Sequence, residues 1–225
     1  MVSFKSLLVA ATGALALAFD AKPSETHARE LLTPRTGAPS STGRHGGYYY
    51  YFWTDGGGTV NYHNKDNGSY KVDWQDCGNF IGGKGWSPGR PRTINFDAAF
   101  NTTGNGYLTI YGWMSNPPVE YYIIESFGTY DPTAYVRNYG TYDADGSMYK
   151  LGHTVRYGQI PMEGAETLDR IWAVRQTERT SGSVDVGAHF EAWKAKGLRL
   201  GATHAYQIVG TEGYQSTGSA EVTVS

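Results

Sequence analysis

Cysteine is nearly absent from this chain: Cys77 is the only one among 225 residues. Because a disulfide needs two cysteines, none can form within the chain, and stability must come from packing and hydrogen bonding. The six histidines are scattered and lack the short spacings that metal-binding sequences share. We therefore expect no metal site.

An excess of charge of either sign is also lacking. The 19 basic and 21 acidic residues give a formal net charge of −2, so nothing attracts nucleic acid or an anionic membrane electrostatically. Long runs with helical periodicity are scarce, whereas glycines number 30, tyrosines 18 and tryptophans 6. This composition favours many short strands joined by tight turns. The length suits one domain with an N-terminal extension.

The N-terminus has the pattern of a secretory signal. Lys5 supplies positive charge, and residues 7–18 form an apolar run that is too short to span a bilayer. We predict a signal peptide over residues 1–18 and a pro-segment or disordered lead over residues 19–44. The folded domain is then residues 45–225, and the protein is expected to be secreted and extracellular.

An aromatic run at residues 46–53 predicts the first strand of the domain. Side chains alternate along a strand, so Tyr49, Tyr51 and Trp53 share one face while other rings occupy the opposite face. One face must therefore cover a core, and the other must line a surface that tolerates rings. Sugar rings suit such a surface through their apolar C–H faces, although an ordinary aromatic cluster fits the pattern equally well.

Residues 117–125 predict another strand, which begins at a proline pair. Its β-branched and aromatic residues suit a pleated sheet, and alternation places Glu120 beside Tyr122 on the face opposite the predicted core. A second glutamate, Glu212, has similar neighbours. An exposed strand glutamate is the ordinary interpretation of each residue. Two such glutamates on one concave sheet would make a general acid/base pair.

The remaining pattern indicates further strands, one helix and one projecting loop. Residues 186–196 predict the only sizeable helix, with Gly197 as its C-cap, and Asn67-Gly68 predicts a hairpin turn. Residues 159–168 lack strand alternation and predict a hairpin loop. The other expected strands are residues 60–62, 70–74, 93–96, 107–113, 149–155, 171–176, 205–214 and 220–224.

Several motifs, taken together, resemble those of the family 11 endo-1,4-β-xylanases over residues 46–224. The matching motifs are FWTDGGG (52–58), GNFIGGKGW (78–86), YGW (111–113), PVEYY (118–122), WAVR (172–175) and TEGY (211–214). The resemblance implies an all-β fold, a β-jelly roll of two curved antiparallel sheets with a single α-helix. It also implies a cleft for xylan and retaining hydrolysis through a covalent glycosyl-enzyme intermediate, without a cofactor.

The resemblance also implies a role for each matched site residue. Glu120 is expected to be the nucleophile and Glu212 the acid/base, and Asn79 is its neighbour, where the family carries Asn or Asp. Arg156 matches the arginine whose charge helps to keep the nucleophile ionised. The other expected substrate-binding residues are Trp53, Tyr111, Tyr122 and Tyr206.

The sequence departs from the family pattern in the loop that closes over the substrate, the thumb (residues 160–171). The Phe, Gln and Tyr that the family carries before its Trp are replaced by Leu168, Arg170 and Ile171. The altered thumb bears on affinity and product pattern rather than on the reaction class, because both glutamates are in place.

Two other functions remain open from the sequence. A jelly roll that binds a polysaccharide without cutting it would use the same aromatic residues, and a β-1,4-glucanase of the same fold would use the same glutamates. The glutamate motifs favour the enzyme because stacking alone needs no carboxylate pair. We expect a xylan polysaccharide as the partner and a monomer.

Overall fold

The computed structural model describes residues 36–158 and 166–225. The predicted signal peptide and most of the leading segment lie outside these residues, as do residues 159–165 of the predicted loop. The elements before the single helix are β1 (Thr36–Gly37), β2 (Ser41–His45), β3 (Tyr48–Thr54), β4 (Thr59–Asn64), β5 (Ser69–Gln75), β6 (Asn79–Trp86), β7 (Thr93–Ser115), β8 (Val119–Phe127), η1 (Pro132–Tyr135), β9 (Arg137–Ala144), β10 (Ser147–Tyr157), β11 (Thr167–Arg175) and β12 (Ser181–Asp185). Helix α2 (Val186–Ala195) and β13 (Thr203–Val224) follow.

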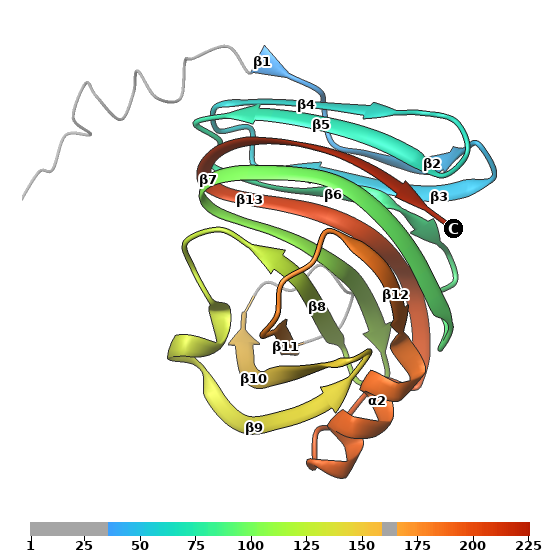
Figure 1. The fold of residues 1–225 in the computed structure, drawn as a ribbon, viewed down its shortest axis with the longest axis vertical. Helices are drawn as coiled ribbons and strands as arrows, with labels where there is room; N and C mark the ends of the chain where they lie inside the picture. The colour runs from blue at the N-terminus through green and yellow to red at the C-terminus, as the bar shows by residue number, and fades with distance from the viewer. Residues whose placement is uncertain (1–35, 159–165) are drawn as a thin grey trace, which may run out of the picture. The chain divides into compact units, whose positions relative to one another are not determined.

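The strands form one curved sheet with the order β1-β4-β5-β13-β7-β8-β11-β10-β9, and β2, β3, β6 and β12 pair beside this path. Most pairs are antiparallel, but β8 and β11 run parallel, as do β1 and β4. The predicted all-β fold with a single α-helix is confirmed for the described residues (Figure 1). Strand β1 and all of β2 except His45 precede residue 45, so the sheet includes part of the segment assigned to the lead.

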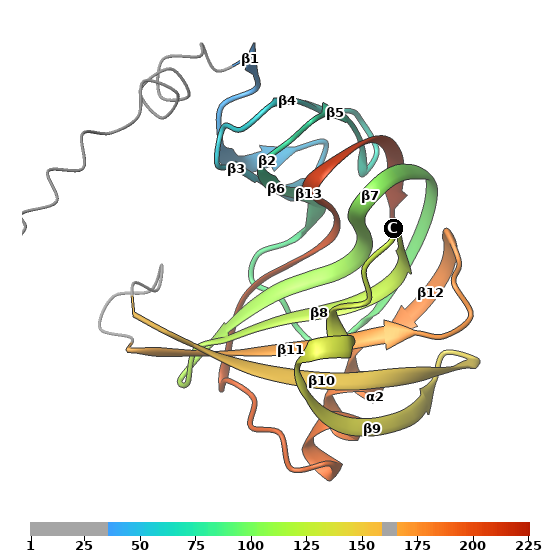
Figure 2. The same ribbon diagram turned by 90° about the vertical axis from the view of Figure 1, so that its left-hand side faces the viewer.

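The two layers expected of a jelly roll are joined by β7 and β13, which Figures 1 and 2 show side by side as long curved strands. Residues 207–214 of β13 pair with β6, whereas residues 218–223 pair with β5. The register shifts between Tyr214 and Thr217, where Gln215 has a φ of 46°. A bulge of this kind bends a strand. The sequence predicts two strands in place of each of them, residues 93–96 and 107–113 for β7 and residues 205–214 and 220–224 for β13, and the structure joins each pair into one strand.

The side chains of β8 divide between two faces, as predicted, and each face is buried in a cluster of its own. Val119, Tyr121 and Ile123 belong to the main core, which the two layers and α2 enclose. Tyr122 and Ile124 belong to a second cluster on the opposite, concave face of the sheet. Strand β8 is therefore covered on both faces, and the concave face carries the residues expected at the site.

Helix α2 follows the predicted bounds closely. The Asp185 side chain accepts a hydrogen bond from the Ala188 amide at 3.1 Å and caps the first turn. Gly197 has a φ of 85°, which favours glycine at a helix C-terminus. Phe190 of α2 packs edge-on against Tyr121 in the core. Among the described residues, no helix has the length and apolar character that crossing a membrane requires.

Candidate active site

The concave face carries an aromatic wall on β3, β13 and β7, with β6 lying between β3 and β13. Tyr206 of β13 stacks on Tyr51 of β3 with ring centroids 5.0 Å apart, and Tyr111 of β7 lies 6.0 Å from Tyr206. Trp53 of β3 is 39% exposed, so its ring is available at the surface of this face. The alternation of β3 predicted that Tyr51 and Trp53 share a face, and the structure places both there.

Glu120 lies in this face, with a side chain only 5% exposed. Its Oε1 accepts hydrogen bonds from the hydroxyls of Tyr111 at 2.8 Å and Tyr122 at 3.1 Å. Burial first, and then the charge of Glu120, raise the pKa of both phenols well above the ordinary value. The two hydroxyls therefore stay protonated and act as donors to the carboxylate.

The other oxygen of Glu120 contacts an arginine. Arg170 of β11 is the parallel cross-strand partner of Glu120, and its Nε donates to Glu120 Oε2 at 2.5 Å. The Arg170 guanidinium also lies over the ring of Trp172, 5.5 Å from its centroid. Although burial lowers the pKa of Arg170, neighbouring negative charge, that of Glu120 above all, raises it above the ordinary value. Both oxygens of Glu120 therefore accept hydrogen bonds, Oε1 from the tyrosines and Oε2 from Arg170.

Glu212 lies across the sheet on β13, with Ile81 of β6 and Tyr107 of β7 as its partners in register. Its Oε2 is buried and has no hydrogen-bond partner within the described part of the chain. Burial, and next the charge of Glu120, raise the pKa of Glu212 to about 8, while Arg170 and Tyr122 act against this rise. Glu212 therefore carries its proton at neutral pH, whereas Glu120 is surrounded by donors.

The side chains of two predicted residues, Arg156 and Asn79, make no hydrogen bond or ion pair with either glutamate in the described part of the chain. Arg156 is exposed on β10 opposite Leu168, and its guanidinium makes no ion pair among the described residues. Asn79 is half-buried on β6 opposite Tyr214, and its Oδ1 is buried without a hydrogen bond to any described residue. Arg170, rather than Arg156, supplies the cation that contacts the carboxylate.

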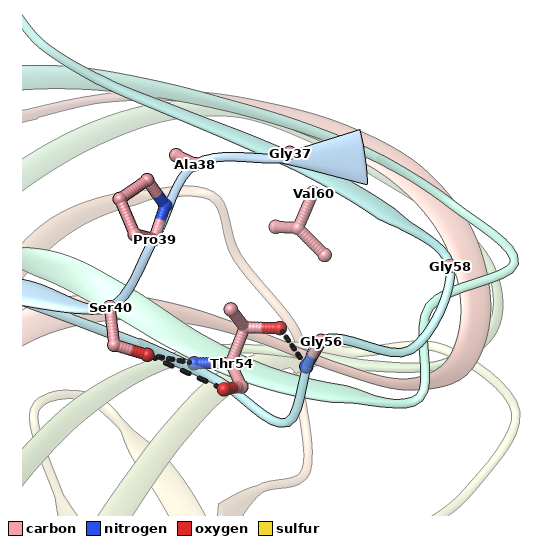
Figure 3. Close-up of a pocket in the computed structure, with 8 residues that line it drawn as sticks. All are labelled: Gly37, Ala38, Pro39, Ser40, Thr54, Gly56, Gly58 and Val60. Atoms are coloured by element: carbon pink, nitrogen blue, oxygen red, sulfur yellow. Dashed lines mark hydrogen bonds between the residues drawn. The ribbon is translucent and has the colours of Figure 1, made fainter. Parts of the chain in front are cut away.

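A separate pocket lies between the margins of β1 to β4 and has a volume of about 490 Å³ (Figure 3). Its only side-chain hydroxyls are those of Ser40 and Thr54, which already bond to backbone: the Thr54 amide donates to Ser40 Oγ at 3.0 Å, and the Gly56 amide donates to Thr54 Oγ1 at 3.1 Å. No charged side chain lines the pocket. It therefore lacks the groups for acid–base chemistry, which the concave face provides.

Two carboxylates in contrasting surroundings on an aromatic face suit glycoside hydrolysis. The family model of glycosyl hydrolases family 11 matches residues 45–223. The chain belongs to glycosyl hydrolase family 11. Its jelly-roll architecture agrees with this membership, as the motifs had indicated.

Known members of family 11 match the chain over its whole length. It is 47% identical to endo-1,4-beta-xylanase 4 of Pyricularia oryzae and 48% identical to endo-1,4-beta-xylanase A of Gibberella zeae. It is also 47% identical to endo-1,4-beta-xylanase 2 of Humicola insolens. Each match covers 100% of this chain and 99% of the relative. No group of three or more His, Cys, Asp or Glu side chains within the described ranges is placed to hold a metal ion.

Sequence reasoning missed the contact of Arg170 with the carboxylate because it assigned residue 170 to the loop. The strand was expected from residue 171, but β11 begins at Thr167. Arg170 and Trp172 alternate in the way that places both on the concave face. Extending the strand pattern by a few residues would have placed Arg170 beside Trp172, whereas its pairing with Glu120 depends on the parallel contact of β11 with β8.

Proposed function

We propose that this family 11 protein is an endo-1,4-β-xylanase that cuts internal bonds of xylan with retention, using Glu120 as the nucleophile and Glu212 as the acid/base. The observation that carries the proposal is the contrast between the two carboxylates. Glu120 accepts hydrogen bonds from Tyr111, Tyr122 and Arg170, whereas burial and the charge of Glu120 keep Glu212 protonated.

These states fit the two steps of retaining hydrolysis. In the first step, a Glu120 oxygen attacks the anomeric carbon, the bond to the leaving sugar breaks, and Glu212 gives its proton to the leaving oxygen. In the second step, Glu212 takes a proton from water, the water oxygen bonds to the anomeric carbon, and the ester bond to Glu120 breaks. Both carboxyls return to their starting states.

The aromatic wall supports a polysaccharide as the substrate. Trp53, Tyr51 and Tyr206 offer ring faces beside the carboxylates, and such faces suit the apolar C–H faces of sugars. The names of the relatives support xylan as this polysaccharide. The proposal also includes a secreted monomer whose residues 1–18 are removed, so peptides from these residues should be absent from the protein in the culture medium.

Release of reducing sugar from xylan and from cellulose tests the proposal. We expect release from xylan, with the β-anomer formed first in a proton NMR time course. Release from cellulose alone would favour a β-1,4-glucanase, and binding to xylan without release would favour a binding module. Glu120→Gln is the matched control, because it keeps the shape of the side chain and should bind xylan without cutting it.

A further inference from the structure

We propose that Arg170 is a counter-ion shared by the two catalytic carboxylates, which neutralises Glu120 in the free enzyme and Glu212 in the glycosyl-enzyme. This inference rests on the proposed function. It concerns a residue at which the chain departs from the family pattern, since the family carries a neutral Gln there. The Arg170 side chain is 27% exposed, so protein covers most of it beside the carboxylates.

During catalysis, negative charge moves from one catalytic carboxylate to the other. In the free enzyme, Glu120 is ionised and Glu212 is protonated, so Arg170 pairs with Glu120. When the glycosyl-enzyme forms, Glu120 becomes a neutral ester and Glu212 loses its proton to the leaving oxygen. The negative charge has then moved from Glu120 to Glu212, while the positive charge of Arg170 stays on β11 beside β8.

The titratable groups that surround the two carboxylates come from several strands of the sheet. The groups that face Glu212 are Glu120 and Tyr122 of β8, Tyr107 of β7 and Arg170 of β11. Those that face Glu120 are Tyr51 of β3, Tyr111 of β7, Tyr122 of β8, Arg170 of β11, and Tyr206 and Glu212 of β13. Arg170 is the single cation among these described groups. No other group among them can therefore neutralise the charge of whichever carboxylate is ionised.

The electrostatics already couple Arg170 to both carboxylates. After burial, Glu120 has the largest influence on the pKa of Arg170, and Glu212 contributes in the same direction. Conversely, Arg170 lowers the pKa of Glu212 against the larger effects of burial and Glu120. Once Glu120 is esterified, its opposing charge is gone and Arg170 acts on Glu212 without a competing anion. Glu212 is then favoured as the ionised general base that the second step needs.

The second step can be observed by itself with 2,4-dinitrophenyl β-xylobioside. Its leaving group needs no proton, so breakdown of the glycosyl-enzyme limits kcat, and the acid limb of kcat against pH reports ionisation of Glu212. In Arg170→Gln we expect this limb to move up by about one pH unit or more, and kcat at pH 5 to fall about tenfold. Arg170→Lys should restore most of the wild-type profile, because it keeps the charge.

Arg137→Gln is the matched comparison, since it removes an arginine of the same sheet, on β9 against Tyr139, that does not contact Glu120. It should leave the acid limb in its wild-type position. The amplitude of the dinitrophenol burst counts correctly folded sites, so a loss of folded protein is distinguished from a change in rate. A second variant, Arg170→Met, gives the same test if Arg170→Gln folds poorly.

A direct readout uses enzyme trapped with a 2-fluoro-xylobioside, in which Glu120 is esterified. Carbon-13 NMR of labelled glutamate should show that Arg170→Gln raises the pKa of Glu212 more in the trapped enzyme than in the free enzyme. An unmoved acid limb, or equal effects in the free and trapped states, would refute the shared counter-ion. If the wild type is not trapped at Glu120, the proposed function itself fails, which is a separate outcome.

Discussion

Strand β8 carries two buried glutamates that bind the same kinds of group and differ in surroundings. Glu120 accepts from Tyr111 at 2.8 Å and from Arg170 Nε at 2.5 Å. Glu125 accepts from the Tyr149 hydroxyl at 2.6 Å and from the Nε of a different arginine, Arg179, also at 2.5 Å. Their side chains are 5% and 1% exposed. Both glutamates are therefore buried, and each accepts hydrogen bonds from a tyrosine and an arginine.

The surroundings beyond these contacts separate the two residues. Glu125 lies near two arginines, because Arg175 approaches its carboxylate at 4.0 Å and donates to Tyr149 at 2.8 Å. Tyr149 belongs to the main core, so this cluster is enclosed by protein. Glu120 instead shares one arginine with a second carboxylate on the concave face. A buried, paired glutamate is thus no sign of catalysis by itself, and the second acid on an open face is what indicates it.

The largest expected effect is on activity when the nucleophile is removed. Glu120→Ala should lower kcat/KM on xylan by about 10⁴-fold or more, because no covalent intermediate can form. Added azide should restore turnover with inverted configuration, measured as the anomer of the glycosyl azide. Glu125→Gln is the control and should keep kcat/KM within about threefold of the wild type. Equal losses in both variants would remove the functional distinction between the glutamates.

The next largest expected effect is on the free energy of unfolding, and here Glu125 rather than Glu120 is the more sensitive residue. Glu125→Ala should lower the free energy of unfolding by about 3–5 kcal/mol, because it leaves two arginines unpaired in a buried cluster. Glu120→Gln should lower it by less, because its amide oxygen still accepts from the tyrosines and the neighbouring Arg170 is 27% exposed to solvent. Urea unfolding followed by tryptophan fluorescence measures both. A more stable Glu125→Ala would show that desolvation of the cluster outweighs its pairing.

A smaller effect comes from deleting one hydroxyl at each glutamate. A hydrogen bond to a charged group is worth about 1.5–3 kcal/mol. Tyr149→Phe should therefore lower the free energy of unfolding by roughly this amount, with little change in kcat/KM. Tyr111→Phe should instead lower kcat/KM by about tenfold or more, with a smaller loss of stability. Comparing urea midpoints and rates for the pair sharpens the contrast, and a purely structural effect of Tyr111→Phe would contradict it.

The smallest expected effect is a shift of the pH profile when a third carboxyl enters the site. Burial and Glu120 raise the pKa of Glu212 to about 8, so loss of its proton should form the alkaline limb of kcat/KM near that pH. The optimum of the wild type is therefore expected to be mildly acidic to neutral. In Asn79→Asp, the new carboxyl and Glu212 should share one proton and titrate as a coupled pair.

The singly protonated pair with an ionised Glu120 is then populated only at lower pH. The whole profile of Asn79→Asp should move to the acid side, by about one pH unit. Lys71→Gln, which removes an exposed charge from β5, is a control that should leave the optimum in place. An unmoved optimum in Asn79→Asp, with some loss of stability, would mean that Asn79 only completes the local backbone geometry.

Local sequence patterns were sufficient for several elements. Alternation along residues 119–124 assigned the two faces of β8, and the pattern of residues 186–196 with the C-cap Gly197 predicted the helix. The motifs led to Glu120 and Glu212 as a pair. Each inference used neighbouring residues or a resemblance along the chain, because periodicity and turn chemistry depend on a few adjacent residues.

Only the tertiary structure decided which distant residues meet. Long-range pairing joined four predicted strands into β7 and β13, made β11 parallel to β8, and thereby placed Arg170 rather than Arg156 against Glu120. It also placed Glu120 on the concave face and Glu125 against Tyr149 of the main core. Cross-strand register follows from the packing of the whole sheet, and a shift by one residue exchanges its faces. The sequence therefore determined which carboxylates and arginines the protein contains. The curvature and register of the sheet determined which of these groups act together.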